Sequence, residues 1–476
     1  MADPPFGFGL PGDRDPDPDD PQQSSGPGQP PGAGGPFGAL GPLGDPQQFA
    51  DALRQFADLM AWRGGPVNWD LAKNVARHAV VAEGDPSVLD SQRRQVDEAL
   101  RLADLWLGDV TALPSGIRSA QAWSRSEWVE ATLPVWSKLC DPIAAKAVES
   151  MGGMFSLDPD ELSDLPPEMR AAMTAMGGGL GGLAPMMQQI GGAMVGGQTG
   201  AAVGALAREV VSSTDVGLPL APEGVAALLP AGIAEFGGGL SVPEDEVRLF
   251  LALREAAHQR LFAHVPWLRG SLLGAVEEYA RGMKVDTSLL RTAMPQVDIT
   301  NPDPEALREA LSGAALFQPE DTPEQKNALS RLETLLALVE GWVATVVDAA
   351  AGHRLPHADA LAEAIRRRRA SGGPAERTFA TLVGLELRPR RLREAAVIWQ
   401  GLTEARGVDG RDALWAHPDL LPTAEDFDDP EGFVRGQPEL DISALEAGGD
   451  QGPTEPGGTG GPGEAPREEG TGAEGE

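Results

Sequence analysis

Residues 254–258, with the sequence Arg-Glu-Ala-Ala-His, hold three side chains that can take part in chemistry. In an α-helix, residues four apart lie on the same face, so Arg254 and His258 should point in one direction. Two histidines at this spacing can bind one metal ion, and a glutamate directly after the first can accept a proton from metal-bound water. Glu255 is therefore the candidate catalytic base, and His258 is a candidate metal ligand.

Arg254 stands where the His-Glu-x-x-His pattern of zinc-dependent peptidases has its first histidine. A guanidinium group stays protonated and has no lone pair to offer to zinc. The substitution at this ligand position removes one of the groups on which zinc binding and peptide hydrolysis depend.

A helix over residues 241–263 is expected to carry this segment. Ser241 and Glu244 have the spacing of a capping box, and Pro266 prevents the helix from continuing. A buried arginine on an apolar helix face requires an anionic partner, because an unpaired buried charge is costly. Residues on that face are Val247, Leu251, Arg254, His258 and Leu261.

A second helix, predicted over residues 328–349, carries Glu340 on an otherwise apolar stripe. Glu340 has two possible functions here. It can complete a metal site together with His258, or it can neutralise Arg254 through an arginine–carboxylate pair that fills the space of the metal. A partly exposed Glu340 without function is the third alternative.

The other histidines are weaker candidates for metal ligands. His264 lies ten residues after Arg254, but on an unbroken helix it is about 120° away from His258 and cannot share a metal with it. His353 and His357 are four residues apart, and the proline between them argues against a common helix face.

The composition excludes some classes of partner. The chain has 38 basic and 71 acidic residues and a net charge of −33, so nucleic acid is not expected as a partner and a membrane surface is disfavoured. The basic run 366–369 is interpreted as a solvated helix face. A single cysteine, Cys140, excludes an internal disulfide and is expected to be buried. With no secretory signal at the N-terminus, a cytoplasmic location is expected.

Three regions follow from the distribution of residue types. Residues 1–46 are rich in Pro, Gly and Asp, and residues 441–476 in Gly, Glu and Pro, so both are predicted to be disordered arms. Helical periodicity dominates residues 47–440, including an amphipathic helix over residues 49–60, and no convincing strand pair is found. The expected fold is a mostly α-helical core between two acidic arms.

Residues 171–207 carry no charged side chain. Glycines recur at every fourth position, which would allow another helix to approach closely. Tight helix packing inside a soluble core is the favoured interpretation, and membrane contact and a flexible loop are the alternatives. The glycines are Gly192, Gly196, Gly200 and Gly204.

Several blocks in order resemble the zincin-like hydrolases of actinobacteria, whose members are often labelled zinc-dependent metalloproteases and whose sister branch is associated with deazaflavin-coenzyme biosynthesis. The blocks are residues 65–72 (GPVNWDLA), 253–267 (LREAAHQRLFAHVPW), 337–342 (ALVEGW), 366–370 and 410–422 (GRDALWAHPDLLP). The resemblance spans about residues 47–440. It implies a zincin-like helical core and zinc as the cofactor. It also implies that Glu255 is the base and that His258 and Glu340 are ligands.

Three functional hypotheses remain. The favoured one is a degenerate metallopeptidase that has become a binding or scaffold protein for a peptide or protein, because Arg254 occupies a ligand position. The second is an active zinc-dependent hydrolase with an altered ligand set built on His258 and Glu340. The third is a membrane- or partner-associated helical protein that uses residues 171–207.

Overall fold

The computed structural model of the chain describes residue 62 and residues 64–154, 180–285, 317–319, 322–370, 374–383 and 391–436. All of these residues belong to one unit, Ala57–Glu476. The predicted arms 1–46 and 441–476 and the helix expected over residues 49–60 lie outside the described residues, as do residues 171–179 of the uncharged segment.

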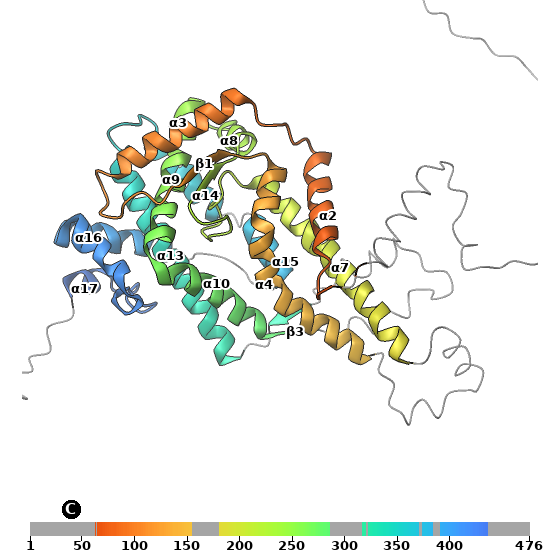
Figure 1. Ribbon diagram of the computed structural model, residues 1–476. Coiled ribbons are helices and arrows are strands. Elements are labelled where there is room, and N and C mark those ends of the chain that lie inside the picture. The colour runs from red at the N-terminus through yellow and green to blue at the C-terminus, as the bar shows by residue number, and fades with distance from the viewer. Residues whose placement is uncertain are drawn as a thin grey trace, which may run out of the picture. The chain divides into compact units, whose positions relative to one another are not determined.

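The described part of the chain is mostly α-helical, which confirms the predicted fold class (Figure 1). Two long helices, α9 and α13, lie at its centre: α9 packs against α3 and α13, and α13 also packs against α10 and α16. The helices are α2 (Trp69–Ala82), α3 (Asp90–Leu107), α4 (Arg125–Met154), α7 (Leu180–Glu209), α8 (Pro230–Gly237), α9 (Glu244–His264), α10 (Pro266–Arg281), α13 (Pro323–Ala351), α14 (Ala358–Ala370), α15 (Pro374–Val383), α16 (Leu392–Asp412) and α17 (Pro430–Arg435), with short 3-10 helices at Ala413–Ala416 and Pro418–Leu420.

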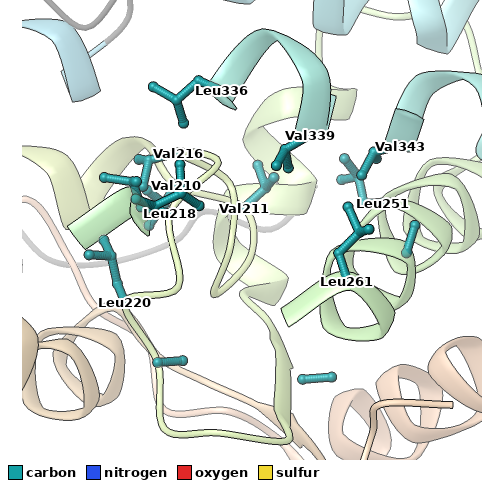
Figure 2. Packing of buried hydrophobic residues seen from close by; sticks show 14 of the residues in the cluster. Val210, Val211, Val216, Leu218, Leu220, Leu251, Leu261, Leu336, Val339 and Val343 are labelled. Atoms are coloured by element: carbon teal, nitrogen blue, oxygen red, sulfur yellow. The ribbon is translucent and has the colours of Figure 1, made fainter. Parts of the chain in front are cut away.

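Helix α9 is buried on all sides over most of its length: every residue from Phe250 to Leu261 is buried. The residues predicted to share an inward face are among them. Figure 2 shows apolar side chains of α9, of α13 and of the segment after α7 gathered in this region, with Leu251, Val343 and Val211 among those labelled. Polar side chains on α9 are therefore enclosed by protein and must find partners there.

The start of α9 differs from the prediction. The helix begins at Glu244, with Pro243 at the N-cap position and no side-chain cap hydrogen bond. A capping box requires a side-chain acceptor and a backbone N–H at the N-cap, and proline supplies neither. Glu244 instead bonds Arg248 one turn later, at 3.1 Å. The end at His264 lies one residue beyond the predicted end.

The glycine face of α7 packs directly against α2, and Figure 1 shows these two helices side by side. A β-carbon at Gly196 would lie 2.5 Å from the Asn68 carbonyl oxygen, and one at Gly200 would lie 2.4 Å from that of Ala72. Real β-carbons do not approach backbone so closely, so the glycines are required for this contact. For its described residues, the favoured interpretation of the segment as a tightly packed helix is confirmed.

Among the described helices, α13 is long and apolar enough to cross a membrane by length and composition alone. The apolar window of this helix is 78% buried inside the protein, however. Burial of this kind is what the central helix of a folded core requires, since its apolar residues face other helices.

Two short strand pairs accompany the helices, where the sequence predicted none. Strand β1 (Ser119–Ala122) pairs in parallel with β2 (Val225–Leu228), and β3 (Met283–Val285) pairs antiparallel with β4 (Phe317–Pro319). Strands of three or four residues are too short to produce a visible alternation of apolar and polar residues. Strand β2 packs against α9, and an isolated bridge joins Ser212 to Leu228. The segment after α7 is thereby held beside α9.

Candidate functional site

Glu340 of α13 is the centre of a buried cluster of charged side chains. Its side chain is 3% exposed and contacts two guanidinium groups and one imidazole ring. Arg254 Nη2 lies 2.6 Å from Glu340 Oε2, while Arg369 Nη2 and His258 Nε2 lie 2.7 and 3.1 Å from Oε1. The ion pair between Arg254 and Glu340, one of the alternatives that the sequence left open, is therefore present.

The surrounding cations keep Glu340 ionised. Burial alone would raise the pKa of this carboxyl group, but Arg369, Arg254 and His258 together hold the pKa well below its ordinary value of 4.5. The carboxylate is charged at neutral pH, and both of its oxygen atoms are engaged by protein groups.

Each ring nitrogen of His258 lies within hydrogen-bond distance of an oxygen atom of the protein. Its Nδ1 atom lies 2.8 Å from the carbonyl oxygen of Arg254, and its Nε2 atom lies 3.1 Å from Glu340 Oε1. Both ring nitrogens are therefore engaged by protein groups, and neither is free to bind a metal.

Glu255 is directed to other partners. Its side chain is completely buried. It accepts hydrogen bonds from Ser213 Oγ at 2.5 Å, from Thr214 Oγ1 at 2.6 Å and from Gln259 Nε2 at 3.0 Å. The backbone N–H groups of Thr214 and Ala227 complete the set, at 3.1 and 3.4 Å. Glu255 thus joins α9 to the segment after α7 and to β2.

The structure therefore brings Arg254, His258 and Glu340 together and places Glu255 in a separate network. Successive helical residues are rotated by about 100°, so Glu255 cannot point the same way as Arg254. The sequence analysis missed the partners of Glu255, because Ser213 and Thr214 lie in a stretch that has the composition of a turn.

One short segment contacts both networks. Ser213 and Thr214 bind Glu255, and a few residues later Gly217 lies against Glu340. The backbone of Gly217 has φ +78°, and a β-carbon there would be 3.1 Å from Glu340 Oε1. Only glycine adopts this conformation readily, and only a residue without a side chain leaves space for the carboxylate.

The interpretation of residues 366–369 as a solvated face is correct for only half of the run. Arg366 and Arg367 are exposed and pair with Glu363. The side chains of Arg368 and Arg369 are 25% and 16% exposed and bind Asp215 and Glu340. Four consecutive helical residues span about 300°, so a packed helix must turn part of such a run inward. That geometric argument could have identified the inward pair from the sequence.

Arg369 is the member of the cluster that the sequence analysis did not assign. Burial lowers the pKa of its guanidinium group, and the charge of Arg254 lowers it further, whereas Glu340 and Asp215 raise it. Its Nη2 atom also donates to the backbone oxygen of Asp215 at 3.0 Å. Arg369 thus links α14 to α13 and to the segment after α7.

A cavity of about 510 Å³ opens beside the cluster, between α9, α13, α14 and α16. Arg254, Arg369 and Glu340 are part of its lining, and Glu255 is not. A second cavity of about 480 Å³ lies near the partners of Glu255 and is lined in part by Thr214, Gln259 and His264.

The sequence profile of the zincin-like metallopeptidases matches residues 67–434. The chain belongs to this family. The match confirms the resemblance and covers both α9 and α13. No curated protein sequence matches the chain.

A solved structure supports the family fold. It is that of a "putative hydrolase with a novel fold" from Chloroflexus aurantiacus, with 20% sequence identity and a TM-score of 0.53. The alignment covers 78% of this chain and 98% of that one. At this level of identity the likeness concerns the fold alone.

Zincin-like metallopeptidases generally bind zinc, but the donor set in this member does not fit the ion. A catalytic zinc needs three protein ligands and one open position. Among the described residues, no group of three or more His, Cys, Asp or Glu side chains is placed to hold a metal. His258 and Glu340 are the two suitable groups at the motif, and each is bonded within a cluster that contains two guanidinium groups. These positive charges would repel a divalent cation.

The remaining histidines lie elsewhere. His264 is exposed, and its Nε2 atom lies 3.1 Å from the backbone oxygen of Ser115. His357 contacts Glu246. These contacts lie outside the Glu340 cluster.

Proposed function

We propose that this zincin-like protein is a binding or scaffold protein without peptidase activity. The observation that carries the proposal is the ion pair between Arg254 and Glu340, at 2.6 Å. It joins the residue at the first ligand position to the candidate downstream ligand, so the two groups neutralise one another in place of a metal.

The environment of Glu255 supports the same proposal. A general base needs a carboxylate oxygen that can reach a water molecule beside the reacting group. Glu255 is completely buried, and its two oxygens accept five hydrogen bonds from the protein. We infer that its function is to fix α9 to the neighbouring segment.

The presence of Glu255 and His258 does not require catalysis in this account. Each has a structural function that explains why the residue type is needed. Glu255 satisfies two hydroxyl groups and two backbone N–H groups that would otherwise be buried without an acceptor, and His258 places its Nε2 atom 3.1 Å from Glu340 Oε1. The alternative, a zinc-dependent hydrolase with an altered ligand set, would have to displace Arg254 and Arg369 from Glu340.

A peptidase assay tests the proposal directly. The full-length protein is incubated with a mixture of peptides, with and without a chelator, beside the Glu255→Gln variant. We expect no cleavage that responds to the chelator and no difference between the variant and the wild-type protein. Chelator-sensitive cleavage by the wild-type protein that is absent from Glu255→Gln would overturn the proposal in favour of the hydrolase.

A further inference from the structure

The cavity beside Glu340 has two arginines at its buried end. The side chains of Arg254 and Arg369 are 10% and 16% exposed, and both line the cavity. Glu340, their shared partner, is the buried anion of the lining, and the remaining charged residues are exposed and so stand toward solvent: Arg366, Arg393, Asp348 and Asp359. The cationic groups are thus concentrated in the part of the cavity that is best shielded from water.

Most of the hydrogen-bonding capacity of these two arginines is unused within the described protein. A guanidinium group has five N–H donors on three nitrogens. Arg254 bonds Glu340 through Nη2, and Arg369 uses its own Nη2 for Glu340 and for the backbone oxygen of Asp215. No Nε or Nη1 atom of either residue is sealed in the interior without a partner. Both side chains line the cavity, so a ligand there is within reach of the unused donors.

The charges around Glu340 do not balance. Two guanidinium groups contact a single carboxylate. Asp215 is the next anion, and it is shared with Arg368. An excess of positive charge in a poorly solvated site favours the binding of an anion, since Coulomb energies are larger there than in water.

The remaining lining indicates what such an anion is attached to. Much of the wall is apolar, and a volume of about 510 Å³ suits a small ligand or one terminal residue of a chain. Two polar side chains, Thr345 and Gln400, are also in the wall. The apolar residues are Phe250, Ala344, Val347, Ala362, Ile365, Leu392, Ala396 and Val397.

We propose that this cavity binds a carboxylate carried on an apolar group, with the carboxylate between Arg254 and Arg369. A guanidinium group matches a carboxylate with two parallel hydrogen bonds, and both arginines are already held in place by Glu340. Little side-chain entropy is therefore lost on binding. The same chemistry is offered by the C-terminal residue of a peptide and by a small aromatic or aliphatic acid.

The inference deepens the proposed function, on which it rests, by naming the class of ligand. Isothermal titration calorimetry on the full-length protein at low ionic strength tests it. The probes are an acetylated tripeptide ending in phenylalanine, the same peptide with a C-terminal amide, 3-phenylpropionate and inorganic phosphate. The zinc content of the same preparation is measured in parallel. A zinc-free protein that binds no carboxylate would refute this inference alone, whereas stoichiometric zinc would refute the proposed function.

We expect the amidated peptide to bind about ten-fold or more weakly than the free acid, because charged hydrogen bonds are lost. Binding of 3-phenylpropionate without the peptide would identify a small acid as the ligand, and the reverse result would identify a peptide terminus. Equal binding of acid and amide, or phosphate binding as strong as that of the carboxylates, would overturn the inference.

Two arginine variants locate the binding site. Arg369→Ala removes one side of the proposed site while Arg254 and His258 still neutralise Glu340, so the fold should persist, as a thermal unfolding curve would verify. We expect carboxylate binding to weaken about ten-fold or more. Arg393→Gln removes an equal charge from the exposed lining and should alter affinity by about two-fold or less. An equal loss in both variants would contradict the assignment to the buried arginines.

Discussion

Arg254 and Glu340 are 86 residues apart in the sequence and form a 2.6 Å ion pair between α9 and α13. The first is at a position where a metallopeptidase motif has a histidine ligand, and the second is on the helix expected to supply a further ligand. The substitution at position 254 is therefore not an isolated loss. Arg254 introduces a positive charge that Glu340 neutralises. His258 and Arg369 also contact Glu340 and complete the cluster.

The two partners of this ion pair should differ in their effect on stability. Glu340→Gln leaves the guanidinium groups of Arg254 and Arg369 beside a neutral side chain, and we expect it to lower the free energy of unfolding by about 3–5 kcal/mol. Arg254→Gln leaves Glu340 with Arg369 and His258, so a smaller loss of about 1–3 kcal/mol is expected. Urea unfolding measures both. A loss in Arg254→Gln as large as that in Glu340→Gln would show that the cluster does not share its charge in this way.

Glu255 should behave as a structural residue. Catalytic groups are often held at a cost in stability, so their replacement tends to leave stability unchanged or to raise it. Here Glu255→Ala leaves buried hydroxyl and N–H groups without an acceptor, and we expect a loss of about 2–4 kcal/mol. Glu255→Gln keeps one acceptor oxygen and should cost less than the alanine variant. If Glu255→Gln were as stable as the wild-type protein or more so, the catalytic interpretation of Glu255 would gain support.

Gly217 is required both by its backbone and by its contact with Glu340. Gly217→Ala forces a side chain into a conformation with φ +78° and places its β-carbon 3.1 Å from the carboxylate, so a loss of about 1–3 kcal/mol is expected. Gly274→Ala is the matched control. It lies within α10 with open space around it, and alanine there should stabilise by about 0.5–1 kcal/mol. Thermal unfolding of the two variants should show shifts of opposite sign.

The stability of the protein should depend on the ionisation of Glu340. The folded protein holds the pKa of this group below its ordinary value, so its contribution is fully present above a pH of about 4.5 and is lost as the pH falls toward the folded value. We expect the difference in unfolding free energy between the wild-type protein and Glu340→Gln to be smaller at about pH 3 than at about pH 6. Urea titrations at these pH values provide the measurement, and a difference that grows on acidification would contradict the assignment.

Helical periodicity was sufficient to predict the centre of the site. It placed Arg254 and His258 on one inward face and Glu340 on an apolar stripe. Because a buried charge is costly, the pairing of Arg254 with Glu340 was one of the alternatives that followed. Arg369 was not predicted as part of the site because a run of arginines has the composition of a solvated surface. Which of these arginines turns inward depends on how α14 packs.

The rest of the site depends on contacts between distant elements. The segment that binds Glu255 has no periodicity of its own, so its position is set by β2 and α7 rather than by its residues. The predicted capping box of Ser241 and Glu244 is wrong because the N-cap is Pro243, so Ser241 lies outside the helix. The strands were too short for a pattern to emerge, although β2 helps to position Ala227 against Glu255.

If Arg254 and Glu340 stand in place of a metal site, the natively purified protein should hold little zinc. Elemental mass spectrometry is applied to the wild-type protein after exposure to zinc and dialysis. The double variant Arg254→His/Arg369→Ala, which restores a histidine ligand and removes a competing cation, serves as a comparison. The account predicts far less than one zinc per wild-type chain and a gain of zinc in the double variant. About one zinc per wild-type chain, lost in His258→Ala, would contradict it.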